Sequence, residues 1–77
     1  MPLYTNREES EDYLTLIDDA GSNTYIGIAS VGSSQSSALW KIKRINESGA
    51  ATIVSWADGS TSFDKVWNDR LTYNYTP

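Results

Sequence analysis

The stretch SWADGSTSFDKVW, residues 55–67, carries the strongest fold signals in the chain, because it combines a turn dipeptide with two of the three tryptophans. Asp58-Gly59 directly follows an apolar segment, and this dipeptide favours a type I′ hairpin turn with positive φ at both central residues. A calcium-type loop needs several oxygen ligands at a set spacing, which the residues after Asp58 do not supply. We therefore interpret Asp58 as a turn residue and not as a metal-binding or catalytic carboxylate.

The second half of this stretch has two interpretations. As a strand, it would place Lys65 on the same face as Phe63 and Trp67. As a helix, it would bring its apolar side chains together, because residues three and four apart share a helix face. The helical spacing fits better, and it predicts one or two helical turns near 62–68. Arg70 is expected to form a structural ion pair with one of three nearby carboxylates, those of Asp58, Asp64 and Asp69.

The sequence on either side predicts strands. Segments rich in β-branched and aromatic residues alternate with clusters of Gly, Asn, Ser and Asp. The predicted strands span 13–18, 24–31, 38–45, 50–56 and 71–75. Short strands at this spacing predict a mainly β fold, either a small antiparallel β-sandwich or an SH3-like barrel of about five strands. Residues 13–77 would form this single domain, preceded by an acidic N-terminal arm at 1–12.

The hairpin between the third and fourth predicted strands can be given a register. Residues 46–49, NESG, suit a three-residue loop in which the glycine adopts the left-handed conformation and forms a bulge. This loop would pair Trp40 with Trp56 and Ile42 with Val54. All four apolar side chains would then share one face of the sheet, and a shift by one residue would separate them.

Size and composition exclude several classes of function. A chain of 77 residues forms one small domain that buries about 60% of its unfolded surface. It contains no Cys and no His, so it offers no thiolate metal site and no histidine general base. No nucleophile motif and no phosphate-binding loop is present. We therefore predict a protein that is not an enzyme and that needs no cofactor.

The net charge of −4 is unevenly distributed. Residues 1–19 contain one basic and six acidic side chains, whereas residues 20–77 contain five basic and four acidic ones. Because non-specific affinity for DNA comes mainly from basic side chains, we do not expect nucleic acid as a partner. The KIKR segment at 41–44 is the one basic cluster, and Lys41 and Lys43 share one face of its predicted strand.

Membrane attachment is also not expected. No apolar run approaches the roughly 20 residues of a membrane span. The first residues, MPLYTNREESED, lack the basic and apolar regions of a secretory signal.

The combined pattern resembles small proteins encoded in tailed-bacteriophage genomes, most of them without an assigned activity. The resemblance covers about residues 24–75 and leaves the N-terminal arm outside. Its elements are Tyr-Ile-Gly at 25–27, Trp-x-Ile-x-x-Ile at 40–45, Trp-Ala-Asp-Gly at 56–59, Phe-Asp-x-Val-Trp at 63–67, Asp-Arg at 69–70 and Leu-Thr-Tyr at 71–73. The resemblance implies a minor virion component of the tail, fibre or capsid surface, found in the virion or in the host cytoplasm during assembly. It implies no catalytic residues.

Three functions follow as hypotheses. The first is a structural or attachment module of a phage particle that contacts other phage structural proteins or further copies of itself. The second is an SH3- or Tudor-like module that binds a peptide or nucleic acid, which requires Trp40 or Trp56 to be exposed in a groove. The third is a small phage regulator of a host protein.

The candidate contact residues come from the arm, the polar loop at 32–37, the basic strand and the last strand. They are Tyr4, Gln35, Lys41, Lys43, Tyr73 and Tyr75. For Tyr73 and Tyr75 the alternative is that both side chains close the core.

Overall fold

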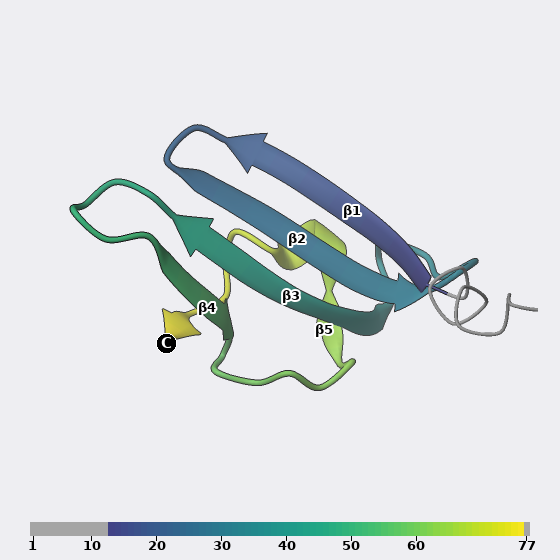
Figure 1. Cartoon of the computed structure of the whole chain (residues 1–77). Helices are drawn as coiled ribbons and strands as arrows, with labels where there is room; N and C mark the ends of the chain where they lie inside the picture. Colours follow the sequence, from purple (N-terminus) through teal and green to yellow (C-terminus); the bar gives the residue numbers. More distant parts are fainter. Residues whose placement is uncertain (1–12, 77) are drawn as a thin grey trace, which may run out of the picture.

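The computed structural model describes residues 13–76, which form one antiparallel sheet with a short helical segment on one side (Figure 1). The elements are β1 (Tyr13–Ala20), β2 (Asn23–Ser30), β3 (Ala38–Asn46), β4 (Ile53–Ala57), β5 (Lys65–Val66), the 3₁₀ helix η1 (Trp67–Asp69) and β6 (Tyr75–Thr76). The strand order is β1-β2-β3-β4-β6, and β5 pairs with the beginning of β3. The predicted mainly β class is confirmed. The predicted arm at 1–12 lies outside the described residues.

Alternation along the strands gives the sheet two different faces. The inner face carries the core, which consists of Tyr25, Ala29, Trp40, Ile42 and Ala57 together with Trp67 from η1. Half-buried side chains at the ends of the chain pack against its margin, namely Leu14, Leu16, Tyr73 and Tyr75. The inner face is therefore covered by η1 and by the segments that flank it.

The indole of Trp67 lies directly on the backbone of β2 at Gly27. A Cβ atom at position 27 would lie 2.4 Å from Cε3 of Trp67 and 3.2 Å from Cε3 of Trp40. The two indole rings are neighbours, with centroids 6.0 Å apart, and both are buried. The glycine therefore provides the space that the second indole occupies, because any side chain at this position would displace it.

The turn at Asp58-Gly59 has the predicted geometry. Both residues have positive φ, 54° and 67°, and Ser60 N donates to Ala57 O at 3.1 Å. It does not close a two-stranded hairpin, however, because β4 pairs with β6 and not with the segment that follows the turn. Asp58 instead holds the C-terminal segment, since its carboxylate oxygen Oδ1 accepts a hydrogen bond from Asn74 N at 3.3 Å.

The predicted register of the β3–β4 hairpin is wrong. Asn46 pairs with Ile53 and Lys43 pairs with Trp56, so a six-residue connection at 47–52 replaces the predicted three-residue loop. Gly49 is not among the glycines with positive φ, and the bulge that the prediction required does not form.

This change of register exchanges the faces of β4, because it moves the strand by an odd number of residues. Val54 and Trp56 lie on the outer face, while the small residues Ser55 and Ala57 are buried on the inner face. The indoles already occupy the inner face, so it accommodates small side chains from β4 and not a third indole.

The helical turn lies later in the chain than predicted. Lys65–Val66 forms a strand, and only Trp67–Asp69 is helical. The strand interpretation therefore applies to Lys65, which pairs with Trp40 of β3 and is buried, with its ammonium group bonded to Asp64. The start of β3 offers free backbone N–H and C=O groups, and Lys65–Val66 pairs with them. This long-range pairing overrides the local preference for a helix.

Two further expectations about the C-terminal part are corrected. The last strand covers only Tyr75–Thr76 and not the whole of 71–75. Arg70 pairs with none of its three sequence neighbours, because its Nε donates to Asp18 Oδ2 on β1 at 2.9 Å. The guanidinium carbon also lies 4.5 Å from the centroid of the Trp67 ring, so Arg70 links β1 to η1 across the core margin.

We expect Gly27→Ala to lower the free energy of unfolding by at least about 2 kcal/mol, because the added methyl group overpacks the site of the Trp67 indole. Gly49→Ala is the matched control, since nothing lies within 4 Å of a Cβ atom there, and its effect should stay within about 0.5 kcal/mol. Denaturant unfolding followed by tryptophan fluorescence measures both. Equal stability of the two variants would contradict the proposed contact.

Candidate functional site: the outer face of the sheet

The side of the sheet opposite the core carries a continuous set of apolar and basic side chains. We call it the outer face. Its apolar and basic members are Tyr13 and Ile17 of β1, Ile26 and Ile28 of β2, Lys41, Lys43 and Ile45 of β3, and Val54 and Trp56 of β4. Thr15, Asp19 and Thr24 lie on the same face. The register places Ile17 opposite Ile26, Ile26 opposite Lys43, and Lys43 opposite Trp56. These four side chains therefore form one row across four strands.

The apolar members of the outer face are accessible to solvent. Ile17 is 67% exposed, Val54 49% and Tyr13 48%, and the isoleucines of β2 are only half-buried. Single exposed apolar side chains are common on protein surfaces and need no explanation. A contiguous set on one sheet face is less common and marks a surface for interaction.

Aromatic rings and lysines alternate at one end of this face. The rings of Tyr13 and Phe63 stack with centroids 6.1 Å apart. Lys41 Nζ lies 5.0 Å from the Phe63 centroid and 5.6 Å from the Trp56 centroid, and Lys43 Nζ lies 5.6 Å from the same indole. These are cation–π distances, so the lysine side chains lie along the aromatic rings and hold them in place. We call these five residues the aromatic–lysine row.

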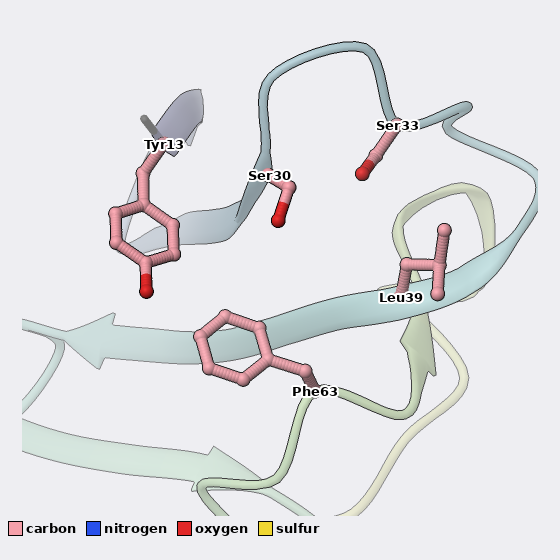
Figure 2. A pocket seen from close by; sticks show the side chains of 5 residues that line it. All are labelled: Tyr13, Ser30, Ser33, Leu39 and Phe63. Atoms are coloured by element: carbon pink, nitrogen blue, oxygen red, sulfur yellow. The ribbon is translucent and has the colours of Figure 1, made fainter. Parts of the chain in front are cut away.

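A shallow hollow of about 240 Å³ lies beside the stacked pair, where the ends of several elements meet (Figure 2). Tyr13 and Phe63 form one wall, and the other lining residues are Ser30, Ser33 and Leu39. Pockets for small-molecule ligands usually have volumes of about 300–1,000 Å³. The size suits one side chain of a partner better than a substrate.

Two of the predicted contact residues, Lys41 and Lys43, are brought together on this surface. Gln35 lies apart from them in the loop between β2 and β3, where its side chain is exposed and its carbonyl oxygen accepts a hydrogen bond from Asn68 N at 3.1 Å. The same loop accepts the Trp40 indole N–H at Ser34 O, 2.9 Å away. Tyr4 lies outside the described residues.

Tyr73 and Tyr75 lie on the other side of the sheet. Tyr73 accepts a hydrogen bond from Val66 N at 2.8 Å, and Tyr75 donates one to Arg70 O at 2.7 Å. The Tyr75 ring meets Tyr25 edge-on, with centroids 5.6 Å apart. The interpretation that these tyrosines close the core is confirmed.

Burial raises the pKa of the Tyr75 hydroxyl well above its usual value, and the neighbouring Tyr25 raises it further. Arg44, whose guanidinium carbon lies 5.1 Å from the Tyr75 ring centroid, acts in the opposite direction but does not outweigh burial. The phenol therefore stays protonated and keeps its hydrogen bond to Arg70 O at pH values where a free tyrosine ionises.

The tryptophans divide into two classes. Trp40 and Trp67 are buried in the core, whereas Trp56 is partly exposed on the outer face. Sequence reasoning counted Trp56 with the core and did not assign Ile17, Ile26 or Ile28 to a surface. The correct register of β4 would have placed Trp56 on the outer face, opposite Lys43.

The described part of the chain contains no group of three His, Cys, Asp or Glu side chains placed to hold a metal ion. None of residues 13–76 belongs to a helix long and apolar enough to span a membrane.

Comparison of the chain with protein-family models, with curated proteins and with solved structures finds no match. The resemblance to phage proteins therefore stays a prediction, and the geometry of the outer face is the observation from which a function can be argued.

Because the raised pKa of Tyr75 belongs to the folded state, its contribution to stability is complete below about pH 10 and is lost as pH rises through the folded value. We expect the free energy of unfolding to fall above pH 10, and Tyr75→Phe to lessen this slope by up to about 1.4 kcal/mol per pH unit. At pH 7 the same variant should lose about 1 kcal/mol with its hydrogen bond.

The control for this measurement is Tyr13→Phe, which removes the same hydroxyl from an exposed tyrosine and leaves the hydrogen bond between Tyr75 and Arg70 in place. Denaturant unfolding at several pH values between 8 and 12 provides the slopes. A Tyr75→Phe variant with the wild-type pH dependence would contradict this assignment.

Proposed function

We propose that this protein is a structural or attachment module of a bacteriophage particle, on its tail, fibre or capsid surface, and that it acts through protein–protein contacts made by the outer face. The observation that carries the proposal is the row of Ile17, Ile26, Lys43 and Trp56 across four strands, in which Ile17 is exposed and the other three side chains are half-buried. The phage assignment rests on the sequence resemblance alone.

The outer face suits a protein partner better than a small ligand. Its apolar members lie on four adjacent strands, and the hollow beside it is small. Aromatic side chains contribute large contact areas at low entropic cost, and they are enriched at the centres of protein interfaces. Val54 and Ile17 add exposed β-branched side chains to the same face.

The charges of the face define the chemistry of the partner. Lys41 and Lys43 are its basic members, and the register places neither of them beside an acidic residue of the face. A partner surface that combines apolar side chains with Asp or Glu would complement both features. The partner we propose is therefore a phage structural protein that presents an apolar patch bordered by carboxylates.

Incorporation into particles tests the proposal. Particles of the phage that encodes the protein should contain it when purified and analysed by quantitative mass spectrometry. Val54→Lys and Lys43→Glu should each lower the amount per particle at least tenfold, because the first places a charge in the apolar contact and the second repels the acidic groups of the partner.

Leu71→Lys is the matched control for Val54→Lys. Leu71 is 67% exposed but follows η1, away from the outer face, and its variant should be incorporated like the wild type. Purified particles without the wild-type protein would refute the assignment to the virion. Normal incorporation of both outer-face variants would refute the assignment of the surface.

The aromatic–lysine row favours one second candidate, a module that binds single-stranded nucleic acid. Rings between lysines can stack with bases while the ammonium groups approach phosphates. The overall acidic charge opposes this function. Since Trp56 is the partly exposed tryptophan, its fluorescence should change when oligothymidylate binds at low salt. Saturable quenching that disappears in Phe63→Ala would favour this candidate, and no change would exclude it.

A further inference from the structure

β1 is the long open edge of the sheet. Within residues 13–76 it pairs with β2 alone, and all eight of its residues are paired in a continuous register without a bulge. The opposite edge, β6, has only two residues. Proteins usually protect a long edge with a proline, a bulge or an inward-pointing charge, because unpaired N–H and C=O groups recruit another strand.

The apolar side chains of β1 are also incompletely covered. On the outer face Ile17 is 67% exposed, and on the inner face Leu14 and Leu16 are only half-buried at the core margin. A neighbouring strand beside β1 would cover apolar side chains on both faces and would pair the open backbone groups at the same time. β1 carries two charges that restrict how such a neighbour can lie: Asp18, which pairs with Arg70 at the inner margin, and Asp19 on the outer face.

We propose that β1 pairs antiparallel with β1 of a second copy of the chain across a two-fold axis, which joins two sheets into one. A second copy of β1 is a suitable partner strand for symmetry reasons. In an antiparallel pair related by a two-fold axis perpendicular to the sheet, residues of the same face lie opposite one another, so each apolar face of β1 meets its own equivalent.

The positions of the acidic residues select the register. An axis at Asp18 or Asp19 would place identical carboxylates directly opposite one another, which is destabilising. An axis at Ile17 avoids this. It places the most exposed apolar side chain of the strand against its own equivalent. It also places Thr15 opposite Asp19 of the partner subunit and Leu16 opposite Asp18 of the partner subunit.

The dimer would also make one continuous surface of the two outer faces, since both lie on the same side of the joined sheet. The dimer does not depend on the proposed function, because it uses the edge of β1 and not the surface around Trp56. The two proposals can therefore fail separately.

Measurement of mass in solution by light scattering tests the dimer. The full chain should have twice the mass of one chain at micromolar concentration, and Ile17→Lys should have the mass of one chain, because two ammonium groups would meet at the axis. Val54→Lys places the same charge on the same face, at another exposed β-branched residue, on β4. It should keep the mass of the dimer, although it is expected to lower incorporation into particles.

Cysteine variants test the register and do not depend on the folding of Ile17→Lys. The chain has no cysteine, so a single introduced thiol can form only an intermolecular disulfide. Residues opposite one another in an antiparallel pair have Cα atoms about 4.5–5.5 Å apart, which a disulfide can bridge. Ile17→Cys should therefore form a covalent dimer in air at low protein concentration. Tyr13→Cys should stay reduced, because the two copies would lie far apart along the paired strands.

The outcomes are distinct. A monomeric wild-type chain at 100 μM, or a dimer that keeps its mass in Ile17→Lys, would overturn the proposal. Cross-linking of Tyr13→Cys but not of Ile17→Cys would overturn it as well, because the contact would then lie outside the centre of β1.

Discussion

The contact between the Trp67 indole and the backbone of Gly27 holds the rest of the structure in place. The missing Cβ lets the ring lie on β2, and the ring then brings η1 beneath the sheet and β5 onto the start of β3. Arg70 packs over the same ring and reaches Asp18 on β1, so one indole links elements from both ends of the chain. A side chain at position 27 would loosen all of these contacts together.

The same arrangement explains why the outer face is open. A chain of 77 residues has enough apolar residues for one core, and η1 with its neighbouring segments covers one side of the sheet. Nothing among residues 13–76 forms a second layer over Ile17, Val54 and Trp56. The outer face and the edge of β1 are the two surfaces to which we assign partners, and each has its own proposed occupant.

Local signals were reliable where one residue type decides the backbone. The Asp58-Gly59 turn followed from the conformational freedom of its residues, and the first three strands followed from alternation, with ends within two residues of those observed. Predictions that depended on contacts between residues far apart in the sequence were wrong. The hairpin register was inferred from a loop of suitable composition, but the position of β4 depends on which side chains fit beside Trp40 and Trp67.

The sequence by itself determined the mainly β class and the turn at 58–59, because each depends on residue type or on short-range spacing. The tertiary structure decided which tryptophans are buried, how Arg70 and Asp18 meet across 52 positions, and which side chains share the outer face. These features depend on strand register. A shift by an odd number of residues exchanges the two faces of a strand, and only packing of the whole core selects among such shifts.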